Sequence, residues 1–158
     1  RQRQMCIRDS GCPISEEELG RRYRLNLTNR PFWLNNEFVF LGEIPENKSA
    51  DIDDTALVHK TNEGIFIITG CSHSGIINII NYAKQVCKEG RILGVLGGFH
   101  FLKKSEEELE EICSLMLKAG VNPEYPLYPC HCCDLKSKII MSKFFNVQEV
   151  CTGDVLNC

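Results

Sequence analysis

The sequence predicts a single layered α/β domain in which strands and helices alternate along the chain. Short apolar runs, typical of buried strands, occupy residues 65–69, 92–96 and 125–128. The segments between these runs contain apolar residues at every third or fourth position, which is the period of an amphipathic helix. With 158 residues, of which 43% are hydrophobic, the chain is long enough for one domain with its own core.

The beginning of the chain shows the weakest pattern. Residues 1–12 have no apolar period, so we interpret them as a non-native or disordered leader and assign residues 13–158 to the domain. Residues 32–34 and 38–41 predict two short strands around a polar turn. Residues 46–54 are polar and acidic, which is typical of a loop.

The elements that follow are better defined. Residues 55–60 alternate, and a polar turn joins them to the buried run at 65–69, which predicts a β-hairpin. The helical pattern that begins at Ile76 is expected to end at Lys88 and Gly90.

Two more helices have clear starts. Ser105 and Glu108 predict a capping box at the start of a helix that runs to Gly120. Asp134 is expected to cap the last helix, and residues 147–150 and 155–156 are predicted to be closing strands. The apolar residues of that last helix are Leu135, Ile139 and Ile140.

Composition excludes several classes of function. The formal net charge of −3 argues against a basic nucleic-acid-binding face. No apolar stretch is long enough to span a bilayer and no leader suggests secretion, so we expect a cytoplasmic protein without a membrane partner. Ten cysteines with no regular spacing favour reduced thiols over a disulfide framework.

Three segments place a histidine directly after a predicted strand. Gly-Cys-Ser-His ends at His73, Gly-Gly-Phe-His ends at His100, and Pro-Cys-His-Cys-Cys contains His131. The carboxyl ends of neighbouring strands meet at one edge of a sheet, where α/β proteins build their sites. Because imidazole is the commonest metal ligand among side chains, we predict His73 and His131 as metal ligands. His100 is predicted to contact either the metal or a substrate.

Alternatives remain open within these segments. His73 could instead pack or cap in its loop, although the flanking Gly70 and Gly75 permit close backbone approach to a ligand. Cys71 could be a further ligand or a small buried thiol. The four residues from 130 to 133 could be read as a zinc knuckle, but adjacent residues cannot all converge on one tetrahedral ion. A single ligand at His131 is therefore favoured.

Other polar residues are interpreted as structural. His59 is expected to face solvent on the outer strand of the hairpin. Asp53 and Asp54 precede that strand and are interpreted as loop solvation. The acidic run at 106–111 is interpreted as the solvated face of a helix, with its carboxylates near the positive helix N-terminus.

Five segments, in order, match the signatures of a known family. They read Leu-Gly-Glu-Ile-Pro at 41–45, Asp-Asp-Thr-Ala-Leu at 53–57, Thr-Gly-Cys-Ser-His-Ser-Gly-Ile at 69–76 with Asn78, Gly-Gly-Phe-His at 97–100, and Cys-His-Cys at 130–132. With them, the chain from residue 32 to residue 155 resembles the C-terminal half of metallo-β-lactamase-fold proteins. It is most similar to the branch related to 7,8-dihydropterin-6-methyl-4-(ribofuranosyl)aminobenzene-phosphate synthase.

The resemblance implies an αββα sandwich with one or two divalent transition-metal ions, usually zinc, at the sheet edge between its halves. It implies that His73 and His131 are metal ligands and that His100 lines the same pocket. Such an ion would activate water or polarise a phosphoryl or carbonyl oxygen of a small-molecule substrate. In the named branch the implied chemistry is transfer of a pterin-methyl group.

The sequence departs from the family pattern in two places. The signature His-x-His-x-Asp-His of the N-terminal half is absent, and Cys133-Asp134 replaces the usual Thr-Gly. Whether this chain is itself an enzyme therefore stays open, and we expect weak metal binding and no turnover from it alone. The alternatives are a half-fold that pairs with a second chain or a missing N-terminal half, and a small zinc module organised by residues 130–133.

Overall fold

The computed structural model describes residues 21, 28–45 and 54–156. The proposed leader at residues 1–12 and residues 46–53 of the acidic loop lie outside this part of the chain. Among the described residues, no helix combines the length and the apolar character that crossing a membrane requires.

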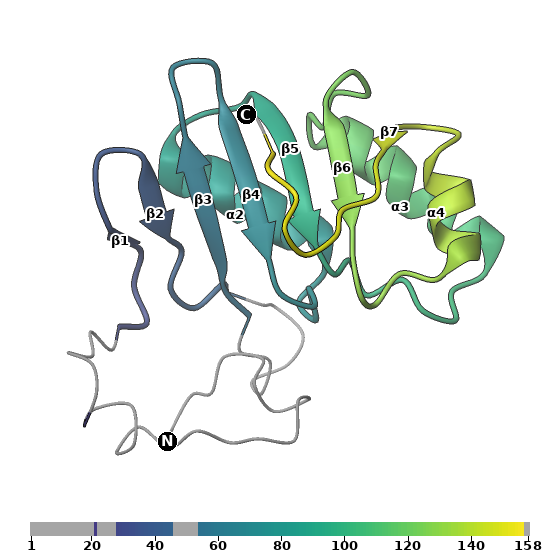
Figure 1. Cartoon of the computed structure of the whole chain (residues 1–158), viewed down its shortest axis with the longest axis horizontal. Helices are drawn as coiled ribbons and strands as arrows, with labels where there is room; N and C mark the ends of the chain where they lie inside the picture. Colours follow the sequence, from purple (N-terminus) through teal and green to yellow (C-terminus); the bar gives the residue numbers. More distant parts are fainter. Residues whose placement is uncertain (1–20, 22–27, 46–53, 157–158) are drawn as a thin grey trace.

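In the described part of the chain, seven strands form one mixed sheet whose spatial order follows the sequence (Figure 1). The first four pair antiparallel, and the fourth to seventh pair parallel. The strands are β1 (Phe32–Trp33), β2 (Phe38–Phe40), β3 (Ala56–Lys60), β4 (Ile65–Thr69), β5 (Ile92–Gly97), β6 (Pro126–Pro129) and β7 (Asn146–Val147). The predicted hairpins β1–β2 and β3–β4 and the strand–helix alternation are thus confirmed.

Each parallel pair of strands is connected by a helix. α2 (Ile76–Cys87) follows β4, α3 (Glu106–Lys118) follows β5, and α4 (Leu135–Met141) follows β6. Figure 1 shows α2 and α3 behind the sheet, while the chain after β7 passes in front of it. The helices therefore cover one face of the sheet and leave the other to different contacts.

The two faces of the sheet differ in burial because side chains alternate along each strand. One row across five strands is fully buried and belongs to the same apolar core as the buried side chains of α2 and α3. This row consists of Val39, Val58, Ile67, Val95 and Leu127. The neighbouring row on the opposite face, which we call the outer row, is only half-buried. The outer row consists of Phe40, Leu57, Ile68, Leu96 and Tyr128.

The predicted helix starts are confirmed. The Ser105 side chain accepts a hydrogen bond from the backbone N–H of Glu108, and the Glu108 carboxylate accepts one from the Ser105 N–H. Asp134 accepts a hydrogen bond from Ser137 N at 2.8 Å at the start of α4. At the end of α2 the left-handed residue is Lys88.

One prediction for the last part of the chain is wrong, because residues 148–150 and 155–156 form no strand. Leu135 and Ile139 of α4 are 74% and 55% exposed, because this two-turn helix buries only its side bearing Ser137, Ile140 and Met141. The closing strand is limited to β7, and Val155 lies outside any strand and is 84% exposed. An apolar run near the chain end was therefore a poor guide to burial.

Candidate metal centre at the strand ends

The loops that follow β4, β5 and β6 are bound to one another at one edge of the sheet. Gly98 N–H donates to Gly70 O at 2.7 Å, which ties the second loop to the first. Ser72 Oγ donates to Gly98 O at 2.6 Å and adds a second tie. Phe101 N–H donates to Cys132 O at 2.9 Å and joins the second loop to the third. The predicted convergence of the three histidine-bearing loops therefore occurs.

Within this edge, His73 and His100 form one pair. Their ring centroids are 5.0 Å apart and the rings are nearly perpendicular, at 86°. Both residues are exposed. His100 has φ = 56°, a left-handed conformation that costs a residue other than glycine roughly 1 kcal/mol or more. Strain of this kind is concentrated at binding and catalytic sites.

Asp54 adds a carboxylate to this pair. It is only 4% exposed, and its Oδ2 accepts a hydrogen bond from Ser74 N at 2.5 Å. Its Oδ1 lies 4.0 Å from Nδ1 of His73. The interpretation of Asp54 as loop solvation is therefore wrong, because the loop after β4 closes over its carboxylate. Asp53 lies outside the described residues.

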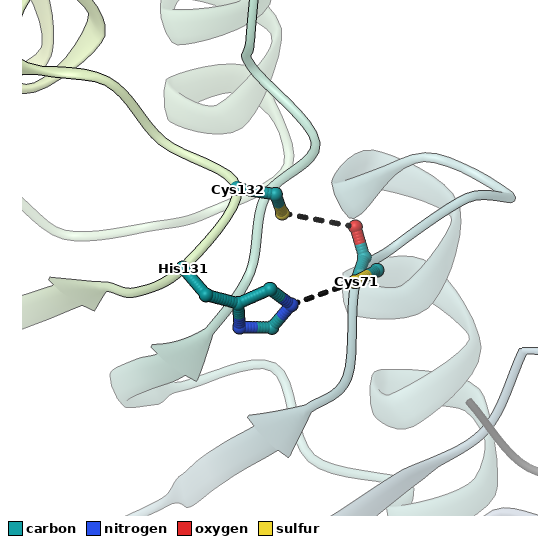
Figure 2. Close-up of side chains that lie close together, drawn as sticks. All are labelled: Cys71, His131 and Cys132. Atoms are coloured by element: carbon teal, nitrogen blue, oxygen red, sulfur yellow. Dashed lines mark hydrogen bonds between the residues drawn. The ribbon is translucent and has the colours of Figure 1, made fainter. Parts of the chain in front are cut away.

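His131 forms a second group, with Cys71 and Cys132 (Figure 2). The Sγ of Cys71 lies 2.6 Å from Nε2 of His131. The Sγ of Cys132 accepts a hydrogen bond from His100 N at 3.0 Å and lies 3.6 Å from Cys71 O. Among the described residues, this is the one group of three or more possible ligands whose donor atoms all lie within 4.8 Å of one another.

Glycine at two positions makes the close approach of these loops possible. A Cβ at Gly98 would lie 2.5 Å from Cys132 Sγ and 2.9 Å from Cε1 of His131. Gly97 has φ = 141°, and a Cβ there would overlap the Thr69 backbone. The Gly97-Gly98 pair therefore provides the space in which the His131 group assembles.

The other two cysteines of the third loop lie outside this group. Cys130 Sγ donates to Tyr128 O at 3.4 Å, within its own strand end. Burial raises the pKa of the Cys133 thiol to about 11. The zinc-module hypothesis grouped residues 130–133. The structure instead groups His131 and Cys132 with Cys71, which is distant in sequence, and leaves Cys130 and Cys133 out.

The remaining polar candidates have structural surroundings. His59 is half-buried and stacks on Phe38 with ring centroids 4.5 Å apart, so it is less exposed than predicted. In the acidic run, Glu106 and Glu110 lie 2.9 and 3.5 Å from Nζ of Lys143. These ion pairs agree with the interpretation of the run as a solvated helix face.

Comparison with known proteins shows which fold this chain resembles. No family model matches the chain. A solved structure described as a metal-dependent hydrolase of the β-lactamase superfamily, Tm1679, superposes with a TM-score of 0.71 at 28% identity, covering 84% of this chain and 57% of that one. The α/β fold of this chain is therefore similar to that of a metallo-β-lactamase-superfamily structure, as the sequence predicted.

Two curated relatives come from Methanocaldococcus jannaschii. The protein named "Uncharacterized protein MJ0448" is 26% identical over 144 residues, covering 83% of this chain and 54% of the relative. The 7,8-dihydropterin-6-methyl-4-(beta-D-ribofuranosyl)-aminobenzene-5'-phosphate synthase is 26% identical over 93 residues, covering 59% and 31%. The predicted branch is thus among the relatives, and the chain spans about half the length of MJ0448 and less of the synthase.

Proposed function

We propose that this chain contributes the C-terminal metal ligands of a metallo-β-lactamase-fold enzyme, either a metal-dependent hydrolase or a dihydropterin-methyl transferase-like protein. The proposed ligands are His73, His131 and His100. The observation that supports it best is the convergence of three histidine-bearing loops at one sheet edge, in a fold shared with a metal-dependent hydrolase.

The donor set fits a divalent transition metal. Imidazole nitrogens suit zinc and its neighbours in the first transition series. Nδ1 of His73 is the ring nitrogen nearest to the buried Asp54 carboxylate, at 4.0 Å, so Nε2 is left to bind an ion. A carboxylate behind a ligating histidine is the usual second partner in such sites. An ion held here would polarise a phosphoryl or carbonyl oxygen of a small-molecule substrate.

The chain's own residues would position this chemistry. Asp54 holds the loop of His73 through its hydrogen bond from Ser74 N. Ser72 Oγ, donating to Gly98 O, keeps the loops of His73 and His100 at a fixed separation. His100 is exposed beside His73 and is therefore also placed to contact a substrate.

Further ligands would come from outside this sequence. Its four histidines are His59, His73, His100 and His131, and the sequence contains no His-x-His-x-Asp-His. We propose that a second chain, or the N-terminal half of a longer protein, supplies the remaining donors. On this proposal the domain comprises residues 13–158, the cytoplasm is its compartment, and the chain alone binds zinc weakly without turnover.

A second candidate function is an inactive half-fold that serves as a metal-binding or partner-binding module. The observation that favours it is the group of Cys71, His131 and Cys132, which lies wholly within this chain. The half-buried outer row supports a partner-binding role, since a second sheet could cover it.

Metal analysis tests the first proposal. The full chain, purified with reductant and equilibrated with zinc, should lose bound zinc when His73→Ala or His131→Ala is introduced. His59→Ala is the matched control, because His59 stacks on Phe38 instead of lying at this edge. Unchanged zinc content in both His73→Ala and His131→Ala would refute the shared site.

A further inference from the structure

The group of Cys71, His131 and Cys132 adds two thiols to His131, which the histidine site also uses. Cys71 comes from the loop after β4, and His131 and Cys132 come from the loop after β6 (Figure 2). These loops are 60 residues apart in sequence, yet Cys71 Sγ and His131 Nε2 are 2.6 Å apart. The juxtaposition is therefore a product of the tertiary fold.

We propose that Cys71 Sγ, His131 Nε2 and Cys132 Sγ form a binding site for a thiophilic divalent cation of the zinc class, built from this chain alone. The site shares His131 with the proposed function and differs from it in its two thiols. It requires no ligand from another chain and neither His73 nor His100, so loss of thiol ligation and loss of zinc at the histidine site are separate outcomes.

The separations of the three donor atoms suit such an ion. In a tetrahedral zinc site with bonds of about 2.3 Å to sulfur and about 2.0 Å to nitrogen, the donor atoms lie roughly 3.3–3.8 Å from one another. The three atoms here all lie within 4.8 Å of one another, and the pair of Cys71 and His131 is at 2.6 Å. The pair at 2.6 Å must separate by roughly 1 Å for both atoms to bind one tetrahedral ion.

The backbone around the donors is fixed. His100 N–H donates to Cys132 Sγ at 3.0 Å, and hydrogen bonds to sulfur are typical of the surroundings of metal-bound thiolates. Gly98 N–H donates to Gly70 O at 2.7 Å and holds the residue before Cys71 against the β5 loop. The missing side chain at Gly98 leaves room for Cys132 Sγ and the His131 ring.

The exposure of the donors leaves one side of the site open. Cys71 and Cys132 are 9% and 6% exposed, whereas His131 is exposed. Three protein ligands with an accessible fourth position are the arrangement of zinc sites that bind an external ligand. Two sulfur donors also select zinc-class ions over magnesium and calcium, which prefer oxygen ligands.

Cobalt(II) is a suitable probe, because sulfur ligation of this ion gives a charge-transfer absorption in the near ultraviolet. The full chain, kept reduced with a phosphine, is titrated with cobalt and then with zinc. We expect the absorption to appear with cobalt and to disappear as zinc displaces it. Cys71→Ser and Cys132→Ser should each weaken cobalt binding at least tenfold and reduce the absorption.

Matched variants separate this site from its surroundings. Cys130→Ser changes a thiol in the same loop whose Sγ bonds Tyr128 O, and it should keep full absorption. His73→Ala should also keep it, even if zinc content at the histidine site falls. Loss of the absorption in either control, or its persistence in both Cys71→Ser and Cys132→Ser, would overturn the proposal.

Cysteine alkylation of the wild-type chain provides a test that does not depend on folding of the variants. Saturating zinc should slow alkylation of Cys71 and Cys132 at least tenfold, as measured by peptide mass spectrometry, and leave the rate at the exposed Cys151 unchanged. Equal rates at Cys71 and Cys132 with and without zinc would refute the site.

Discussion

The carboxylate of Asp54 lies 4.0 Å from Nδ1 of His73, joining the start of β3 to the loop that follows β4. The carboxylate is almost completely buried, and the Ser74 N–H donates to its other oxygen at 2.5 Å. At 4.0 Å the carboxylate is beyond hydrogen-bond distance of the ring and acts on it through its charge. A carboxylate behind a ligating histidine is the usual second partner in metal sites.

Replacing Asp54→Asn should therefore weaken zinc binding at the histidine site. Asparagine keeps the shape of the side chain and can still accept the Ser74 hydrogen bond, but it removes the charge beside His73. Loss of such a second partner typically costs about 10–100-fold in metal affinity. Competition titration of the full chain against a zinc chelator measures the change.

The control for this variant is Asp134→Asn, which alters a carboxylate that caps α4 through Ser137. Hydrogen bonds from Ser137 lower the pKa of Asp134, so this change should lower stability above the ordinary carboxyl pKa and leave zinc affinity unchanged. An Asp54→Asn chain with wild-type zinc affinity would show that Asp54 has no part in orienting His73.

Gly98→Ala should destabilise the fold and disrupt the His131 group. The added Cβ would lie 2.5 Å from Cys132 Sγ and 3.0 Å from Gly70 O, so side chain and backbone must both shift. Overpacking of this kind costs roughly 1–3 kcal/mol in the free energy of unfolding. Urea unfolding measures this loss of stability.

Gly90→Ala is the control, because no atom lies within 4 Å of the new Cβ. Its unfolding free energy should stay within about 0.5 kcal/mol of wild type. Equal stability of the two variants would contradict the crowding argument.

The order of strands and helices and the positions of the three histidines could be predicted from the sequence, because periodicity and strand ends are local properties. The role of Asp54 and the approach of Cys71 to His131 could not, since both depend on how the loops fold over one another. Asp54 lies in one of the five family-like segments, and that was the available signal. The spacing of Leu135 and Ile139 correctly predicted a helix. A two-turn helix has too few apolar residues for their spacing to show which side packs on the core, and both residues are exposed.

Stability should fall above pH 9 because of buried thiols. Burial raises the pKa of Cys113 from 9.0 to about 11, so between these values the unfolded chain loses a proton that the folded chain keeps. The unfolding free energy then decreases with pH, by at most about 1.4 kcal/mol per unit for one group. Urea unfolding below pH 9 and again near pH 11 measures how far the unfolding free energy falls between the two pH values. This fall should be smaller in Cys113→Ala than in wild type, by roughly 1–2 kcal/mol. Cys151→Ala, at an exposed position, should keep the wild-type slope; a wild-type slope in Cys113→Ala would contradict the burial argument.

The outer row should make the isolated chain self-associate, because its half-buried apolar side chains lie on the sheet face opposite α2 and α3. Leu57 and Leu96 lie in this row on either side of Ile68. The double variant Leu57→Gln and Leu96→Gln should weaken dimerisation at least tenfold, which corresponds to about 1.4 kcal/mol. Sedimentation velocity over a concentration series measures the dimerisation constant.

Leu115→Gln is the control, because it changes an exposed leucine of α3 on the other side of the sheet. This variant should dimerise like wild type. A wild-type chain that stays monomeric and melts cooperatively at high temperature would show that the outer row needs no partner.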